Sequence, residues 1–515
     1  MNTPSCRRPS ALMCAFFFAS TVSIFAQGSL TPPGPPAPTM KTLQQVQPRT
    51  DVATLSGDSS DQFVINQPGS YYLTGNINGV SGKNGIIVLS DNVTIDLNGF
   101  AMVGVSGAQT GIYISSPHSG IRIFNGAIRN WNAGGIYALQ ATESMFERIQ
   151  VINNIGNANI TTGANCEVIE CVARGGGAGG ISSGDGCVIE RCILQNNANL
   201  SLSTGDNCTI VGCTAQQNLV NGINSGAGCA ITGCTAKANQ GVGISTGNSC
   251  MVKGCASFGN NAPGLTSAHG IQTGQGSTIT ECAVQSNNGI GINVAGGCVI
   301  SDCSVLLSQT HNIVTLDGCT IRHSVASSST AGFGIDTATS CTIIGCTVQA
   351  NSSGDGIVTG DHCTVKDCTL SMNQGAGAIH TGMDSTISGC TVQNNQDVGI
   401  LVSDGSSVTA CTANGNQSEG IKVTTKCVVA NNSADGNGQG GIHATGGGNR
   451  IESNVVRNNT LFGITVDTSN AGNLIVRNSA GNNTSGPYSN VAGNNDYGPV
   501  SSNPSAATNP FTNFQ

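Results

Sequence analysis

A Gly-Ile dipeptide, or a close variant of it, recurs about every 21 residues through most of the chain. From Ile160 onward the step between successive anchors is 21 or 22 residues, apart from one step of 27 between Ile244 and Ile271. This period indicates one small supersecondary unit stacked on copies of itself, because a single unit cannot bury its own apolar face. The anchors are Ile86, Ile112, Ile136, Ile160, Ile181, Leu202, Ile223, Ile244, Ile271, Ile292, Ile313, Ile335, Ile357, Ile379, Ile400, Ile421, Ile442 and Ile464.

Each repeat has the pattern of three short strands separated by glycine-containing bends. Three strands in 21 or 22 residues is the size of one turn of a parallel β-helix, where each strand pairs with the strand one repeat later. Charged residues are only 9% of the chain and aromatics 4%, which favours a thin core extended along one axis. In residues 222–242 the alternating inward positions are Ile223, Ser225, Cys229, Ile231, Cys234 and Ala236.

An asparagine recurs five residues after the second cysteine position of the repeat. Stacked Asn side chains at a bend can hydrogen-bond to one another and to the backbone, so we interpret this column as structural. Its members are Asn197, Asn218, Asn239, Asn260, Asn287, Asn351, Asn373, Asn395, Asn416, Asn437 and Asn459.

The pattern G-I-x-[ST]…C-x-I-x-x-C-[TS]-[AV]-x-x-N resembles the right-handed parallel β-helix superfamily over about residues 60–480. That superfamily includes pectate lyases, polygalacturonases, alginate epimerases and non-enzymatic maturation proteins, so the resemblance implies a fold and no single activity. The first rungs also resemble those of exported bacterial β-helix proteins of unknown function. The expected fold is all-β: a single-stranded, right-handed parallel β-helix solenoid of about 18 rungs of 21–27 residues, with handedness following the family and the crossover rule.

The two ends of the chain differ from the repeats. Residues 1–26 have two arginines followed by a short apolar stretch, as in a secretory signal peptide, and residues 27–40 form a proline-rich linker. We expect residues 41–80 to cap the first rung, residues 81–484 to form the β-helix, and residues 485–515 to form a C-terminal cap or tail.

Charge and export limit the partners. Removal of the predicted signal takes two of the 19 basic residues and none of the 27 acidic ones. A mildly acidic chain without basic clusters argues against nucleic acid and against anionic membranes. We therefore expect a secreted, periplasmic or cell-surface protein with no membrane span after signal removal; the sequence does not indicate an oligomeric state.

Most of the 23 cysteines form two columns, one C-x4-C pair per repeat. Where a column lacks Cys it has Ser or Asn, so the position requires a small side chain. Three interpretations remain open: stacked buried thiols, disulfides between neighbouring rungs, and metal binding. Disulfides suit an exported protein, but parallel stacking separates the Cβ atoms too far for an unstrained bond. Zinc sites usually have paired C-x2-C knuckles, which this chain lacks.

A first candidate ligand site lies near the N-terminus. Tyr113 and Tyr137 each follow a Gly-Ile anchor and should lie on adjacent rungs, pointing outward. Exposed aromatic rings beside Arg can stack on sugar faces and hold carboxylates. Alternatively, the tyrosines only cover the first rungs and Asp96 pairs with Arg122. The other proposed members of this platform are Trp131, Arg122 and Arg129.

Two further outward columns carry ionisable residues. His380 and Lys422 are two rungs apart, roughly 10 Å, which suits flanking a ligand; His443 continues the column, and a scattered solvated face is the alternative. Asp185 and Asp206 occupy the same turn on successive rungs and could share Ca²⁺, although Asp commonly caps its own turn. No other metal or cofactor is indicated.

No catalytic residue can be assigned. The Asn-Thr-Asp, Gly-His-Gly and Arg-Ile-Lys motifs of polygalacturonases and the Asp-Pro-His-Asp motif of the epimerases are missing. We therefore predict an exported β-helix protein that binds or presents to an extracellular polysaccharide or cell-surface glycan. The alternatives are a polysaccharide lyase acting on acidic glycans and a structural or adhesive surface solenoid without catalytic role.

Overall fold

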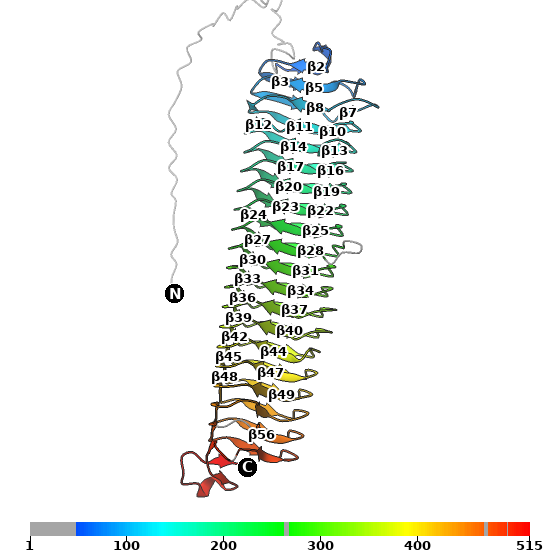
Figure 1. The fold of residues 1–515 in the computed structure, drawn as a ribbon. Helices are drawn as coiled ribbons and strands as arrows, with labels where there is room; N and C mark the ends of the chain where they lie inside the picture. Colours follow the sequence, from blue (N-terminus) through cyan, green and yellow to red (C-terminus); the bar gives the residue numbers. More distant parts are fainter. Residues whose placement is uncertain (1–47, 262–266, 468–471, 492) are drawn as a thin grey trace, which may run out of the picture. The chain divides into compact units, whose positions relative to one another are not determined.

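The computed structural model describes residues 48–261, 267–467, 472–491 and 493–515 (Figure 1). The predicted signal peptide and proline-rich linker lie outside these residues. The chain divides into two units, Met1–Pro48 and Arg49–Gln515. The second unit is a stack of parallel rungs whose strands lie one above another along a single axis (Figure 1). Within the described residues no helix is long and apolar enough to span a membrane.

Each rung contains the three strands that the repeat predicts. One rung consists of β23 (Ile223–Ser225), β24 (Ala230–Thr232) and β25 (Thr235–Lys237). The pairing is parallel and in register with the period, since Ile223 of β23 lies opposite Ile244 of β26 (Ile244–Thr246). The predicted parallel β-helix is therefore confirmed.

The strands that carry the Gly-Ile anchors form one sheet, here named the anchor sheet. Among the described residues it has 20 strands, against about 18 rungs predicted. The additional end strands are β2 (Asp61–Ile65), where Phe63 takes the anchor place, and β59 (Gly486–Ser489), where Tyr488 does. Aromatic residues replace isoleucine there, so the Gly-Ile pattern misses these rungs.

The anchor strands between these ends follow a simple rule. Most have three residues and begin at the anchor: β8 (Ile112–Ile114), β11 (Ile136–Ala138), β14 (Ile160–Thr162), β17 (Ile181–Ser183), β20 (Leu202–Thr204), β23 (Ile223–Ser225), β26 (Ile244–Thr246), β29 (Ile271–Thr273), β32 (Ile292–Val294), β35 (Ile313–Thr315), β38 (Ile335–Thr337), β41 (Ile357–Thr359), β50 (Ile421–Val423) and β53 (Ile442–Ala444). Four begin two residues earlier and have five residues: β5 (Asn84–Val88), β44 (Gly377–Thr381), β47 (Val398–Val402) and β56 (Phe462–Val466).

The other two strands of each rung belong to a second sheet. From residue 167 to residue 481 each has three residues and begins directly after a Cys, Ser or Asn of the two cysteine columns, from β15 (Glu167–Ile169) and β16 (Val172–Arg174) to β57 (Leu474–Val476) and β58 (Ser479–Gly481). Nearer the N-terminus two long strands, β10 (Arg122–Arg129) and β13 (Met145–Ile152), pass through both positions.

Short elements complete the two ends of the stack. At the N-terminal end they are β1 (Thr50–Asp51), η1 (Val52–Thr54), β3 (Gly69–Tyr72), β4 (Ile77–Asn78), β6 (Val93–Asp96) and β7 (Ala101–Val103), with β9 (His118–Ser119) and β12 (Ala141–Thr142) paired as a small separate sheet. At the C-terminal end they are β60 (Asp496–Tyr497), β61 (Val500–Ser501), η2 (Pro504–Ala506) and β62 (Asn513–Phe514).

The core is one thin column made mostly of aliphatic side chains and thiols, with the aromatic residues Phe146 and Trp131 near its N-terminal end. The predicted inward residues of the rung at 222–242 are all buried, including Ile223, Cys229 and Ile231. The glycine of the Gly-Ile pair is required by close approach, because a Cβ on Gly222 would lie 2.6 Å from the carbonyl oxygen of Gly243 in the next rung. This contact explains why Gly precedes the anchor.

Each rung also turns at three residues with left-handed backbone, for example Gly228 (φ 66°), Gly233 (φ 61°) and Ala238 (φ 52°). Glycine adopts this conformation freely, whereas another residue costs about 1–2 kcal/mol there. Asn occupies many of these corners and tolerates the conformation best among the remaining residues. The corners thus explain the high Gly and Asn content.

The predicted asparagine ladder is present inside one turn. Asn239 Oδ1 accepts hydrogen bonds from the backbone nitrogen (3.1 Å) and Nδ2 (2.8 Å) of Asn218. Its own Nδ2 donates to Asn260 Oδ1 at 3.0 Å and to the Ala215 carbonyl at 3.1 Å. Every polar atom of the buried side chain is therefore paired, and successive rungs are held in register.

The cysteine columns form a second kind of ladder. Cys187 Sγ accepts from the backbone nitrogen of Cys166 at 3.3 Å and donates to the Gly163 carbonyl at 3.2 Å. Ser277 accepts in the same way from Cys250 (3.2 Å), which explains why Ser replaces Cys in the column. All 21 cysteines of the described residues are buried, free thiols, so here Cys acts as a small hydrogen-bonding side chain.

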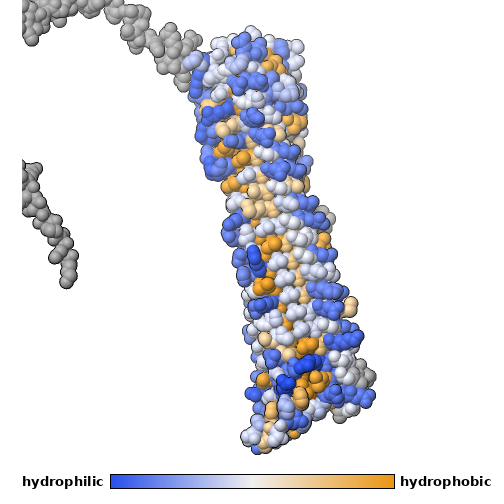
Figure 2. All heavy atoms as spheres, turned by 90° about the vertical axis from the view of Figure 1, so that its left-hand side faces the viewer, coloured by the Kyte–Doolittle hydropathy of each residue, from blue (hydrophilic) through white to orange (hydrophobic). Residues whose placement is uncertain are grey.

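The outward face of the second sheet carries few charges over most of its length. Figure 2 shows the side on which β24 to β48 (Ser407–Thr409) are labelled in Figure 1, and a pale to orange band runs along it with blue side chains at its margins. Threonines contribute to this face on four successive rungs, at Thr320, Thr342, Thr364 and Thr386.

Candidate functional site

In each anchor strand the residue directly after the anchor lies on the face away from the core, because the residues on either side of it face the core. These residues form one continuous row, here named the central row, with one side chain per rung at about 4.8 Å spacing. From the N-terminal end the row is Val64, Ile87, Tyr113, Tyr137, Thr161, Ser182, Ser203, Asn224, Ser245, Gln272, Asn293, Val314, Asp336, Val358, His380, Leu401, Lys422, His443, Thr465 and Ser489. Neighbouring groups cover Ile87 and Thr161, which are both 8% exposed.

The two tyrosines follow Val64 and Ile87 in the row. Tyr113 of β8 (Ile112–Ile114) lies opposite Tyr137 of β11 (Ile136–Ala138), as the period predicts. Their ring centroids are 5.7 Å apart with an interplanar angle of 44°, and both side chains are half-buried. The pair presents an aromatic surface with two phenolic hydroxyls.

Trp131 does not join this surface, and its predicted exposure is wrong. The side chain is fully buried, and its Nε1 lies 3.4 Å from the Met102 carbonyl. It occupies space that glycines leave open, since a Cβ on Gly79 or Gly85 would lie 2.8 Å from the indole ring. Trp131 therefore packs inside the N-terminal rungs of the core.

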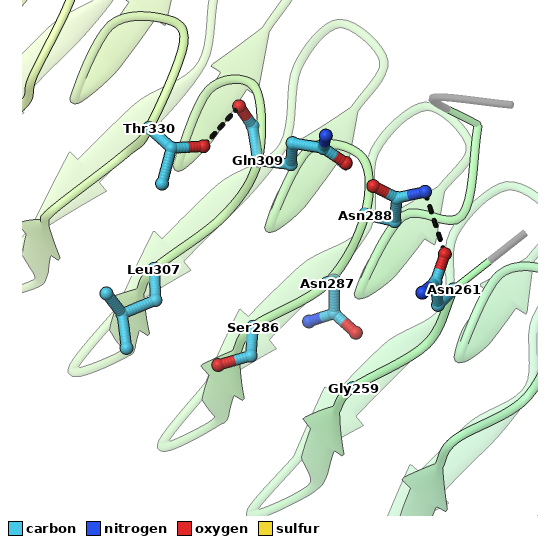
Figure 3. A pocket seen from close by; sticks show the side chains of 8 residues that line it. All are labelled: Gly259, Asn261, Ser286, Asn287, Asn288, Leu307, Gln309 and Thr330. Atoms are coloured by element: carbon cyan, nitrogen blue, oxygen red, sulfur yellow. Dashed lines mark hydrogen bonds between the residues drawn. The ribbon is translucent and has the colours of Figure 1, made fainter. Parts of the chain in front are cut away.

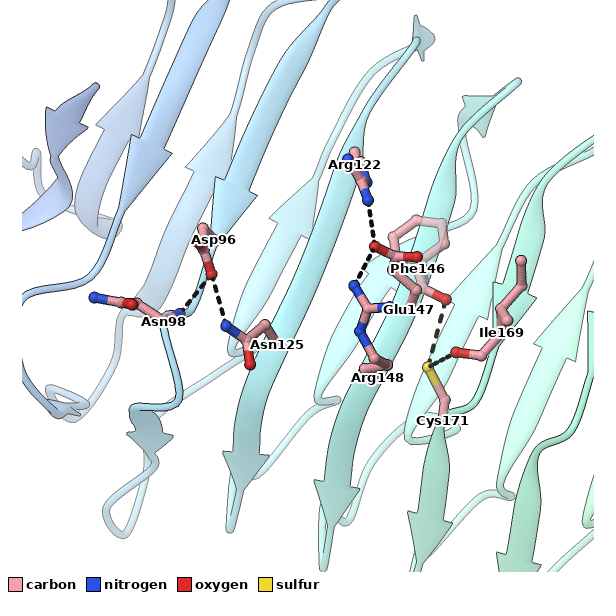
Figure 4. Close-up of polar contacts among 9 residues, drawn as sticks. All are labelled: Asp96, Asn98, Arg122, Asn125, Phe146, Glu147, Arg148, Ile169 and Cys171. Carbon is pink, nitrogen blue, oxygen red and sulfur yellow. Dashed lines mark hydrogen bonds and ion pairs between the residues drawn. The ribbon is translucent and has the colours of Figure 1, made fainter. Parts of the chain in front are cut away.

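Arg122 and Arg129 belong to β10 in the second sheet and not to the anchor sheet that carries the tyrosines. Arg122 and Arg148 both pair with Glu147 (Figure 4). The alternative pairing of Arg122 with Asp96 is also wrong.

Asp96 instead accepts from the Asn98 backbone and the Asn125 side chain, which Figure 4 draws, and pairs with Arg49 at 3.2 Å. Figure 4 also shows Cys171 of the thiol ladder donating to the carbonyls of Phe146 and Ile169. The surface between the two long strands is thus occupied by internal contacts, and the N-terminal platform reduces to the tyrosine pair.

Seven uncharged polar side chains follow the tyrosines without interruption, from Thr161 to Asn293. Four of them carry hydroxyls and three carry amides, and both groups donate and accept hydrogen bonds. The row offers no charge over these rungs. This stretch suits a ligand that is rich in hydroxyls and uncharged.

The row then becomes ionisable. His380 of β44 lies opposite Leu401 of β47, which lies opposite Lys422 of β50 (Ile421–Val423), so the predicted separation of two rungs is observed. His380 Nδ1 lies 3.2 Å from Oδ2 of Asp355, a buried carboxylate whose Oδ1 accepts from the Gly377 backbone at 3.0 Å. Asp355 thereby orients the half-exposed imidazole.

The same arrangement recurs three rungs later with more partners. His443 Nδ1 lies 3.0 Å from Oε1 of buried Glu419, and its Nε2 lies 3.0 Å from Oδ1 of Asp467. An imidazole that donates at both nitrogens is protonated. The hydrogen bond to Glu419 accordingly raises the pKa of His443, against the effect of burial. The hydrogen bond from His443 lowers the pKa of Glu419 to about 2.

A pocket of about 190 Å³ adjoins this cluster. Glu419 and His443 form one side of the pocket, and Leu461 and Phe462 give it an apolar side. Because His443 has both nitrogens engaged and Lys422 lies 3.6 Å from Glu419, this part of the row presents paired charges.

The acidic partners of these histidines were not predicted from the sequence, although their position in the repeat indicates them. Asp355 and Glu419 each stand two residues before an anchor, and each contacts the central-row histidine of the next rung. Comparing the residues two positions before each anchor, as well as those directly after it, would have placed each acid beside its histidine.

Asp185 and Asp206, the residues suggested to share calcium, have a hydrogen-bonding role in the structure. Asp185 Oδ1 accepts from the Asp206 backbone nitrogen at 2.8 Å, and Asp206 Oδ1 accepts from that of Ala227 at 2.7 Å. Both carboxylates therefore cap the turn of the following rung. Within the described ranges no group of three or more His, Cys, Asp or Glu residues has an arrangement that could hold a metal ion.

Comparison with known proteins bears on the fold. Residues 269–428 match the protein family described as right handed beta helix region. A search of curated proteins finds no match.

Among solved structures, the A-module of mannuronan C-5 epimerase AlgE6 from Azotobacter vinelandii is 12% identical, with 78% of this chain and 90% of that chain covered and a TM-score of 0.31. The periplasmic alginate epimerase AlgG is 11% identical (79% and 76% covered, TM-score 0.20). The Dettilon tailspike protein is 13% identical (84% and 63% covered, TM-score 0.19).

Proposed function

Because the chain is a right-handed parallel β-helix protein with one sheet carrying a continuous outward row, we propose that this row binds an extended polysaccharide outside the cytoplasm. The tyrosine pair is the anchor of the site, and the uncharged stretch from Thr161 to Asn293 continues it. The observation that supports this most is the unbroken register from two adjacent aromatic rings into seven successive hydrogen-bonding side chains.

The chemistry of the row complements a sugar chain. Aromatic rings stack on the apolar faces of sugar rings, and Tyr keeps a hydroxyl for hydrogen bonding. Hydroxyl and amide side chains match hydroxyls because both partners donate and accept. Side chains held on paired strands lose little conformational entropy on binding, which favours affinity. A periodic ligand can therefore contact several rungs in the same way.

The test measures binding of the mature chain to a panel of neutral and acidic polysaccharides by gel retardation and calorimetry. We expect Tyr113→Ala combined with Tyr137→Ala to weaken binding at least tenfold while the thermal unfolding of the protein changes little. Tyr72→Ala is the matched control, since Tyr72 is a half-buried tyrosine on β3 of the second sheet. Equal affinity of the double variant and the control would refute the assignment, and no binding across the panel would favour a structural solenoid.

A lyase acting on acidic glycans is the second candidate, and the Asp355–His380 pair is the observation that favours it. A buried carboxylate that orients an imidazole is a common arrangement for a general base. Chromatography of the same incubations would reveal shortened, unsaturated products. A lyase requires that His380→Ala abolish them and that Tyr113→Ala leave the rate at saturating polymer unchanged.

A further inference from the structure

A second hollow lies away from the central row, at the turn that leads from the second sheet back to the anchor sheet. It spans four rungs and follows β28 (Ala256–Phe258), β31 (Ala283–Gln285), β34 (Ser304–Leu306) and β37 (Val325–Ser327). Its volume is about 330 Å³. Figure 3 shows its eight lining residues: Gly259, Asn261, Ser286, Asn287, Asn288, Leu307, Gln309 and Thr330.

One wall of this groove consists of left-handed corner residues on successive rungs. Gly259 (φ 63°), Ser286 (φ 55°) and Leu307 (φ 54°) occupy the same corner. Leu307 combines an unfavourable backbone conformation with a side chain that is 45% exposed. The same left-handed corner recurs along the stack, so Leu307 is distinguished here by its exposed apolar side chain at the groove.

The other wall is a column of amides and a hydroxyl directly after the asparagine ladder. The backbone nitrogens of Asn261, Asn288 and Gln309 each donate to the carbonyl of a ladder asparagine one rung earlier, at 2.8–3.0 Å. Asn288 Nδ2 donates to Asn261 Oδ1 at 2.8 Å, and Thr330 Oγ1 donates to the Gln309 carbonyl at 2.9 Å (Figure 3). The wall is thus held by the ladder and is organised before any ligand arrives.

The groove contains no ionisable side chain. Amides that donate and accept in one plane match pairs of neighbouring hydroxyls, and the exposed Leu307 side chain offers an apolar contact for C–H groups. A charged ligand would find no countercharge here and would lose hydration on entering. The groove therefore favours a ligand that is neutral, rich in hydroxyls and a few rungs long.

We propose that this groove is a second carbohydrate site, which takes a neutral oligosaccharide independently of the central row. None of its lining residues belongs to the anchor sheet. The proposal does not depend on the tyrosine site, and the two sites can be removed separately.

Calorimetric titration of the full mature chain with neutral hexasaccharides of glucose, mannose and xylose tests this assignment, with a hexasaccharide of galacturonic acid as the charged comparison. We expect Asn261→Ala combined with Gln309→Ala to weaken binding of at least one neutral hexasaccharide about tenfold or more, because two hydrogen-bonding amides are lost. The charged hexasaccharide should not bind at the groove.

The same amide column provides a matched control outside the groove. Gln396 and Gln417 are exposed, and their backbone nitrogens also donate to ladder carbonyls, at 2.9 Å. Gln396→Ala combined with Gln417→Ala should leave the affinity unchanged.

Three results would overturn the proposal. They are an equal loss of affinity in the groove variant and in the Gln396 and Gln417 control, an unchanged affinity in the groove variant, and tighter binding of the charged sugar than of the neutral ones at the groove. Loss of all neutral binding in the tyrosine double variant alone would also overturn it while leaving the proposed function intact. A loss of affinity in the groove variant, with unchanged affinity in the Gln396 and Gln417 control, would support the proposal.

Discussion

The contact of His443 with two carboxylates provides the sharpest test of the energetics of this solenoid. It joins three successive rungs, because Glu419 precedes the first anchor strand concerned, His443 lies on the second and Asp467 follows the third. We predict that His443→Gln lowers the local stability of the rungs formed by β50, β53 (Ile442–Ala444) and β56 by about 2 kcal/mol near pH 5.5.

The magnitude follows from the Glu419 carboxylate. Its pKa is lowered from 4.5 to about 2, with the hydrogen bond from His443 as the largest cause. At about 1.4 kcal/mol per pKa unit, all interactions of this carboxylate together amount to about 3 kcal/mol. His443 contributes the major part, whereas Ser418 and Lys422 contribute the remainder against the cost of burial. Asp467 is nearly half-exposed and adds less than about 1 kcal/mol.

The effect has a defined pH window. The folded pKa of His443 is raised, so its contribution is complete below the ordinary value of 6.5 and disappears as pH rises through the folded pKa. The folded pKa of Glu419 is lowered, so its contribution is present above 4.5 and disappears as pH falls toward about 2. The three rungs should therefore be most stable between about pH 4.5 and pH 6.5.

Hydrogen exchange read by mass spectrometry can resolve this region from the rest of the stack. His443→Gln should reduce amide protection in the three rungs about 30-fold near pH 5.5 and much less near pH 9. His323→Gln is the control, since that side chain is 63% exposed and lies 3.8 Å from Asp302. Unchanged protection in His443→Gln near pH 5.5, or an equal loss at both pH values, would refute the reasoning.

Three further predictions concern the ladders and corners. Asn239→Ala removes four hydrogen bonds between rungs and should lower the free energy of unfolding by about 3 kcal/mol in urea denaturation; a loss below about 1 kcal/mol would contradict the ladder's role. Cys229→Ser should be tolerated, whereas Cys229→Val should cost about 2 kcal/mol more because it leaves the Cys208 backbone nitrogen without its acceptor; equal melting temperatures would refute this. Ala238→Gly and Ala410→Gly should each stabilise the protein by up to about 1 kcal/mol, since both have left-handed backbone; a lower denaturation midpoint would speak against corner strain.

The architecture was largely predictable because the same sequence pattern recurs in nearly every rung. Burial of one apolar residue per rung requires the anchor to return at a constant interval, so Ile223 and Ile244 reveal their pairing in the sequence itself. The asparagine ladder is legible for the same reason. The hydrogen-bonding role of the thiols could not be predicted from the sequence, because the exchange of Cys for Ser at one position indicates a small side chain and does not reveal a shared hydrogen bond.

Some features of the candidate site were likewise predictable from the sequence, and others were not. Periodicity alone determined that Tyr113 meets Tyr137 and that His380 lies two rungs from Lys422, since both relations run along one column. Only the tertiary structure decided contacts between columns. It buried Trp131 against glycines of other rungs and turned Arg122 toward Glu147.

The tertiary structure also placed Glu419 and Asp467 on either side of His443. The physical reason is that a repeat specifies the translation along the axis, whereas the angle at each corner, which determines which columns face one another, depends on backbone torsions at residues such as Gly233 and Ala238.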